Sequence, residues 1–210
     1  SSAYRQGFFM NETPTQQLKE GVSMLTITTA FFNKPKNVEP SKVIPSVKTD
    51  LKNYRDPDLR IIWFGHSSYL IQAEGKNILV DPVFSGYASP FSFSVKAFKG
   101  SNVYQVDDLP EIDILVLTHD HYDHLDYKTV LKLKKKVKHI YTSLGVGSHL
   151  RYWGFSESMI TEFEWGQNWK SADGIELSAE TARHFSGRGF KRAQTLWASY
   201  VLSIGKYKLY

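Results

Sequence analysis

The fold of this chain is decided by the stretch Ile112-Asp-Ile-Leu-Val-Leu-Thr-His-Asp-His-Tyr-Asp-His-Leu-Asp126. Its first seven residues are almost all apolar, which is typical of a strand buried on both faces of a sheet. The loop that follows this strand directly contains three of the seven histidines of the chain, together with three aspartates. Such a density of ligand-type side chains after a buried strand predicts a metal site.

The spacing within this loop predicts two neighbouring metal ions. His119 and His121 point to the same side of an extended backbone, because side-chain direction there has a period of two, so both imidazoles can reach one ion. Asp123 and His124 follow where the backbone begins to coil, and this pair can face a second ion nearby. Imidazole and carboxylate ligands without thiolate favour zinc, iron or manganese. We take zinc as the default and leave iron and manganese open.

The sequence on either side of the loop predicts an α/β protein. Asp126 is suited to cap a helix over Tyr127–Lys136. Short runs rich in β-branched and aromatic residues predict strands before and after this helix. The predicted strands lie within Ile61–Phe64, Tyr69–Ala73, Ile78–Val80, Ile112–Thr118, His139–Thr142, Gly174–Ala182 and Leu196–Gly205, with a return arm over Lys206–Tyr210 and a short helix over Gly147–Trp153.

Composition narrows the class of protein. The chain has 210 residues, of which 41% are hydrophobic and 22% charged, which suits one sizeable core. It has no cysteine, which excludes disulfides, thiolate zinc sites and a nucleophilic cysteine. The formal net charge of +5 suits an anionic substrate or surface. No apolar run approaches the roughly 18 residues of a membrane-spanning helix.

The first part of the chain differs from the rest. Five of the eight prolines fall within the first 57 residues. We therefore expect an N-terminal extension over residues 1–57 that packs on the main domain over residues 58–210. Within this extension the apolar segment Gly21–Phe32 predicts a short helix that packs on the core, with contact to a lipid surface as the alternative.

The motifs together resemble the metallo-β-lactamase superfamily, whose signature is His-x-His-x-Asp-His after a strand. The resemblance extends to the branch that contains the N-acylphosphatidylethanolamine-hydrolysing phospholipase D and its bacterial relatives. It rests on further blocks that keep their order along the chain, which are Gly65-His-Ser-Ser68, Val80-Asp-Pro-Val-Phe84, Ala88-Ser-Pro90, Leu109-Pro-Glu-Ile-Asp113, Arg183-His-Phe-Ser186 and Leu196-Trp-Ala-Ser199. The fold implied is an αββα sandwich, with a hydrolase domain over residues 58–210.

The resemblance also implies roles for single residues. His184 would join the first metal ion beside the two histidines of the loop, while His66 and Asp81 would orient the ligands. The family completes its site with a bridging aspartate in a Gly-Asp-[Ser/Thr]-Gly turn and with a final histidine, and this sequence contains neither. We therefore expect that the C-terminal part of the fold is missing and that another chain or a missing C-terminal segment completes the site.

The activity implied is that of a metal-dependent hydrolase. Two divalent ions would hold a hydroxide that attacks phosphorus or a carbonyl carbon, and Asp123 would pass a proton to the leaving group. The reaction best suited to this branch is phosphodiester hydrolysis in a lipid-like or other anionic substrate. A lactonase or an RNA-processing nuclease of the same superfamily, and an inactive metal-binding interaction module, are the alternatives.

The resemblance also bears on partners and location. We expect a small-molecule or lipid substrate and contact with a membrane surface, and we do not expect a nucleic-acid partner. We expect a cytoplasmic or membrane-associated bacterial protein.

Overall fold

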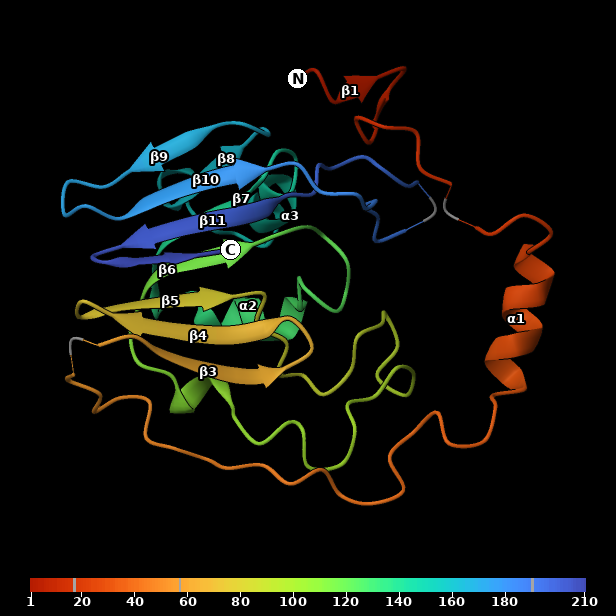
Figure 1. Cartoon of the computed structure of the whole chain (residues 1–210), viewed down its shortest axis with the longest axis horizontal. Helices are drawn as coiled ribbons and strands as arrows, with labels where there is room; N and C mark the ends of the chain where they lie inside the picture. The colour runs from red at the N-terminus through yellow and green to blue at the C-terminus, as the bar shows by residue number, and fades with distance from the viewer. Residues whose placement is uncertain (17, 57, 190) are drawn as a thin grey trace.

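Two β-sheets packed face to face form the centre of the molecule (Figure 1). The computed structural model describes residues 1–16, 18–56, 58–189 and 191–210. The larger sheet has the order β3-β4-β5-β6-β7-β8, with strands β3 (Arg60–Gly65), β4 (Ser68–Ala73), β5 (Lys76–Val80), β6 (Ile112–Leu117), β7 (Val137–Ser143) and β8 (Ile160–Phe163). The smaller sheet has the order β12-β11-β10-β9, with strands β9 (Asn168–Lys170), β10 (Glu176–Glu180), β11 (Ser199–Ile204) and β12 (Tyr207–Leu209).

The direction of the strands places the metal-ligand loop, residues 118–126, at one end of the larger sheet. Strands β3, β4 and β5 form the predicted antiparallel meander, and β5 to β8 run parallel. Val80 at the end of β5 pairs with Val116 in β6, so Asp81 and the loop from Thr118 leave the sheet side by side. The backbone N–H of Asp81 donates to the carbonyl of Val116 at 3.0 Å and continues this register.

Strand β6 is buried on both faces, as its apolar run predicts. Leu115 and Leu117 belong to the core beneath the helices, while Ile114 and Val116 belong to the core between the two sheets. This alternation follows from the period-two geometry of a strand. The metal-ligand loop therefore begins directly after one of the most buried strands of the fold.

Helices cover the outer face of the larger sheet. They are α2 (Tyr127–Leu133) and α3 (Gly147–Tyr152), with 3-10 turns η1 (Val106–Asp108) and η2 (Glu157–Met159). Helix α2 begins at the predicted cap, where the Asp126 side chain accepts a hydrogen bond from the Lys128 backbone N–H, and it ends three residues before the predicted Lys136. Over the described ranges no helix covers the outer face of the smaller sheet. The predicted α/β sandwich is confirmed, with three of its four layers visible.

Helix α1 (Met24–Phe32) corrects the expectation that this segment packs on the core. The helix is present and is capped by Ser23, whose side chain accepts from the backbone N–H of Thr26. However, Leu25 is 73% exposed and Phe32 is 78% exposed. Figure 1 shows α1 standing away from the sheets. The described residues directly before and after the helix are exposed as well.

The first residues of the chain do pack on the domain. A small hairpin of β1 (Tyr4–Arg5) and β2 (Phe8–Phe9) precedes α1, and Ala3 and Phe9 are buried against a loop near the end of the chain. The predicted division between residues 57 and 58 stays a prediction, and Pro57 lies outside the described residues. None of the helices in the described part of the chain has the length and apolarity needed to cross a bilayer.

Candidate metal centre

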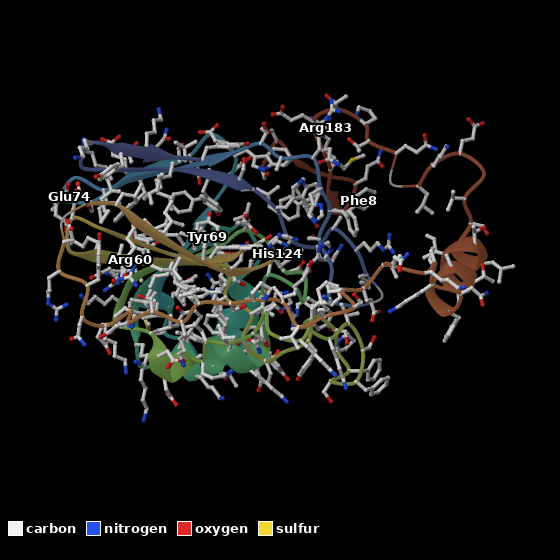
Figure 2. The ribbon with its side chains drawn as sticks, turned by 60° about the horizontal axis from the view of Figure 1, so that its bottom comes forward. Phe8, Arg60, Tyr69, Glu74, His124 and Arg183 are labelled. Atoms are coloured by element: carbon white, nitrogen blue, oxygen red, sulfur yellow. The ribbon has the colours of Figure 1, made fainter. Side chains whose placement is uncertain are left out.

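The predicted ligand residues gather at the carboxyl end of the parallel strands. They come from the loop after β6, from the turn between β3 and β4, which carries His66, and from an irregular segment after β10, which carries His184. Figure 2 shows His124 at this end of the sheets and Glu74, in the turn between β4 and β5, at the opposite end. Three segments that are distant in sequence therefore meet at one edge.

Three imidazoles form the first group. The Nε2 atom of His119 lies 3.0 Å from Nδ1 of His121, and Nε2 of His184 lies 3.1 Å and 3.2 Å from these two atoms. Tetrahedral zinc with Zn–N bonds near 2.0–2.1 Å separates its nitrogen ligands by about 3.3 Å. The three nitrogens thus have the spacing of ligands around one ion.

The pKa values of these three histidines also suit the binding of a cation. Burial lowers the pKa of His119, and the neighbouring imidazoles of His124 and His121 lower it further. Burial likewise lowers the pKa of His121 and of His184. Neutral imidazoles offer lone pairs, and a bound cation removes the repulsion between lone pairs that face each other. The residues present therefore fit a divalent ion.

A second group lies beside the first. Its ligand atoms belong to His66, Asp123 and His124 and lie within 4.8 Å of one another. The Oδ2 atom of Asp123 lies 2.9 Å from Nε2 of His66 and 3.8 Å from Nε2 of His124. His66, predicted as an orienting residue, thus offers a third ligand atom where the sequence predicted only two within this chain.

Asp81 contacts Thr118 and His124 at the base of the metal-ligand loop. Its side chain is buried, and its carboxylate accepts hydrogen bonds from the backbone N–H and hydroxyl of Thr118 at 2.8 Å and 2.6 Å. Its Oδ2 atom also lies 2.7 Å from Nδ1 of His124. Burial alone would lower the pKa of His124, but the hydrogen bond and the negative charge of Asp81, together with the charge of Asp123, raise it. The orienting role of Asp81 stays a prediction.

Two residues of the site adopt a left-handed backbone. His66 has a φ of 49° and Asp81 a φ of 41°. This region is uncommon for residues other than glycine and is enriched at functional sites. The turn and the strand end hold these two side chains in place despite the local strain.

Long-range polar contacts that the sequence did not reveal hold the loops of the site together. Asp120 is buried, and its Oδ1 accepts from the Gly187 backbone N–H at 2.7 Å, while its Oδ2 lies 3.4 Å from Nε2 of His149. Burial alone would raise the pKa of Asp120, but the contact with His149, the hydrogen bond from Gly187, the charge of His149 and a contact with Thr195 together lower it. Arg188 donates to the backbone carbonyl of Asp120 at 2.9 Å. The sequence carries no signal for these contacts, because no local pattern marks their partners.

The structure thus brings every predicted site residue to one place. His119, His121 and His184 form one group, Asp123 and His124 belong to the other, and Asp81 and His66 lie beside them. Whether each of them binds metal stays a prediction.

The chain matches a family model described as beta-lactamase superfamily domain over residues 76–210. An uncharacterized protein of Mycobacterium tuberculosis (strain ATCC 25618 / H37Rv) is 33% identical over 212 residues, which cover 100% of this chain and 57% of that protein. The N-acyl-phosphatidylethanolamine-hydrolyzing phospholipase D 1 of Caenorhabditis elegans is 29% identical over 150 residues, which cover 67% of this chain and 42% of that protein. The chain thus spans little more than half of the mycobacterial relative.

Among solved structures, CmlA, a diiron beta-hydroxylase from Streptomyces venezuelae, is similar with a TM-score of 0.54 and 24% identity. The match covers 74% of this chain and 29% of that protein. At this identity the likeness concerns the fold alone, and it agrees with the two-sheet architecture.

Proposed function

Because the chain belongs to the family of β-lactamase superfamily domains, we propose that the natural protein carrying it is a metal-dependent hydrolase. Within this class, we propose a phosphodiesterase that acts on a lipid-like or other anionic substrate. The observation that carries the proposal is the convergence of three imidazole nitrogens within 3.2 Å of one another, with a second cluster of possible ligands beside them.

Two groups of residues would hold the ions. His119, His121 and His184 would bind one ion, and His66, Asp123 and His124 the other. Zinc, iron or manganese would suit these nitrogen and oxygen ligands. Bound divalent ions would supply Lewis-acid polarisation and would make water nucleophilic at neutral pH. Completion of the second group by another chain or segment stays a prediction.

Asp123 is suited to move a proton. Its side chain is 41% exposed, so it can meet both a substrate and solvent. Its Oδ2 atom lies 2.9 Å from Nε2 of His66, within the second group of ligand atoms. In hydrolysis, Asp123 would take a proton from the attacking water and return it to the leaving oxygen.

The surroundings of the site support a lipid substrate at a membrane surface. The loop between β5 and η1 carries stacked rings of Phe91 and Phe93, which are 60% and 77% exposed. Figure 1 shows this loop and helix α1 on the side of the molecule where the parallel strands end. Exposed apolar side chains near a site are typical of surfaces that bind a membrane or a partner. The name of the nematode relative points to the same substrate class.

A hydrolysis assay tests the proposal. The metal-loaded natural protein is incubated with N-acylphosphatidylethanolamine in water enriched in oxygen-18. We expect water to add to phosphorus, N-acylethanolamine to leave with the proton, and the label to appear in phosphatidic acid. His119→Ala should abolish the reaction, whereas His139→Ala, which changes an exposed histidine of β7, should not.

Three results would contradict the phosphodiesterase. Hydrolysis of lactones alone would indicate a lactonase, and cleavage of RNA alone would indicate a nuclease. Stoichiometric metal binding without hydrolysis of any of these substrates would indicate an inactive metal-binding module. Absence of metal binding would reject the whole proposal.

A further inference from the structure

The N-terminal residues pack against the segment that carries His184. Phe9 and Ala3 are buried in one cluster with Leu196 and Trp197. The backbone N–H of Phe9 donates to the carbonyl of Ala193 at 2.8 Å. The start of the chain is thereby fixed to the loop that contributes the third imidazole of the first group.

Asn11, which follows this hairpin, pairs with the backbone of His184. Its Nδ2 donates to the His184 carbonyl at 3.0 Å, and its Oδ1 accepts from the His184 backbone N–H at 3.1 Å. The Oδ1 atom also accepts from Nε1 of Trp197 at 3.2 Å. One side-chain amide therefore satisfies both main-chain polar groups of His184, much as a neighbouring strand would.

His184 needs such support because its segment is irregular. Residues 181–189 form no helix or strand, so no sheet ladder fixes this backbone. The Nε2 atom of His184 nevertheless lies 3.1 Å from Nε2 of His119. A ligand must be held to within roughly 0.5 Å for a metal site to keep its geometry. The Asn11 amide pairs with the backbone groups of the residue from which this imidazole projects.

We propose that Asn11 is a positioning residue for the first metal ion, acting through the backbone of His184. The inference rests on the proposed metal site. It adds to that site a residue that lies 65 positions before the matched range 76–210. The N-terminal segment is thus part of the metal centre rather than a separate appendage.

Metal affinity tests this role without any turnover. Zn²⁺ binding is measured by competition with a chromophoric chelator, and bound Co²⁺ is followed by its visible absorption. Because loss of a residue that supports a ligand costs roughly 10- to 100-fold in metal affinity, we expect Asn11→Ala to weaken the first site by this factor and to change the Co²⁺ spectrum. Asn11→Asp keeps the acceptor but loses the donor, so we expect a smaller loss.

A matched control and a folding check complete the experiment. Asn168→Ala changes an exposed asparagine of β9 and should leave metal affinity and spectrum unchanged. If Asn11→Ala loses its circular dichroism signal, the Asp variant decides the question. If Asn11→Ala folds and binds metal as tightly as the parent chain, the role of Asn11 is overturned. The same holds if Asn11→Ala does not fold and Asn11→Asp binds metal as tightly as the parent chain. Either result leaves the proposed metal site itself standing. Absence of metal binding by the parent chain would instead overturn the proposed function.

Discussion

Arg188 connects the two loops that supply the first group of histidines, and its removal should destabilise the protein measurably. Its Nη1 donates to the backbone carbonyls of Asp120 and Leu125 at 2.9 Å and 2.5 Å. Its guanidinium lies 4.0 Å from the ring centre of Tyr122, whose hydroxyl donates to the Arg188 carbonyl at 2.7 Å. Arg188→Ala deletes the side-chain contacts and leaves two carbonyls without this donor.

The magnitude follows from these contacts. A hydrogen bond from a charged donor contributes roughly 1.5–3 kcal/mol. The two bonds share one nitrogen, so together they contribute less than twice this amount, and the contact with Tyr122 adds about 0.5–1 kcal/mol. We expect Arg188→Ala to lower the free energy of unfolding by about 2–4 kcal/mol. This is less than the roughly 5–15 kcal/mol of a typical domain, so the variant should still fold.

Urea unfolding followed by tryptophan fluorescence measures this loss. Arg183→Ala is the matched control, because Arg183 lies in the same loop with an exposed side chain, and it should change stability by less than about 0.5 kcal/mol. Arg188→Lys should lie between the two variants, because a single ammonium lacks the planar fork of arginine. A loss below about 1 kcal/mol for Arg188→Ala, or an equal loss for Arg183→Ala, would refute the reasoning.

Three further predictions concern metal, the buried carboxylate and pH. Free metal at about 100 times its dissociation constant should stabilise the chain by about 2.7 kcal/mol. Chelation of the metal should therefore lower the melting temperature by roughly 5–10 °C in calorimetry. His184→Ala, which lacks one ligand, should show a smaller fall in melting temperature on chelation. Asp81→Ala leaves buried donors of Thr118 and His124 without their acceptor. It should lower the free energy of unfolding in urea by about 2–4 kcal/mol. If Asp81→Ala lowers this free energy no more than Asp81→Asn does, the account is contradicted. Burial raises the pKa of Tyr141 to about 12. Its stabilising contribution is therefore complete below about pH 10 and is lost as the pH rises through about 12, and Tyr141→Phe should remove that part of the alkaline decline.

The layers of the fold could be predicted because apolar pattern reports burial directly. The run in β6 predicted a strand with two buried faces, and Leu115 and Val116 do lie in different cores. The same logic failed for α1, where an apolar composition predicted core packing. Composition gives the tendency of a segment to be buried, but burial also needs a surface within reach, and the exposed stretches beside α1 carry it away from the sheets.

The candidate site could be predicted only in part, for a related reason. Side-chain alternation along one loop was enough to bring His119 and His121 together. His184 has no local signal, and only the resemblance to a family assigned it. Asn11 lies 173 positions from its partner, and Arg188 lies 68 positions from Asp120. Hydrogen bonds between such distant residues leave no periodic trace in a single sequence.

These long-range ties determine how the site should respond to mutation. The imidazoles project from loops, so the register of a sheet does not fix them. The side chains of Asn11, Asp120 and Arg188 each hold a different backbone group around these loops, which are those of His184, Gly187 and Asp120. A typical hydrogen bond contributes about 1 kcal/mol net, which is less than the energy needed to release a loop that several bonds hold. Loss of one tie should therefore loosen the first group without abolishing it, whereas loss of an imidazole removes a ligand atom. We therefore expect graded metal affinities among variants of Asn11, Asp120 and Arg188, and a much larger loss of metal affinity for His184→Ala. This result would distinguish a site held by several polar contacts from one that depends on a single contact.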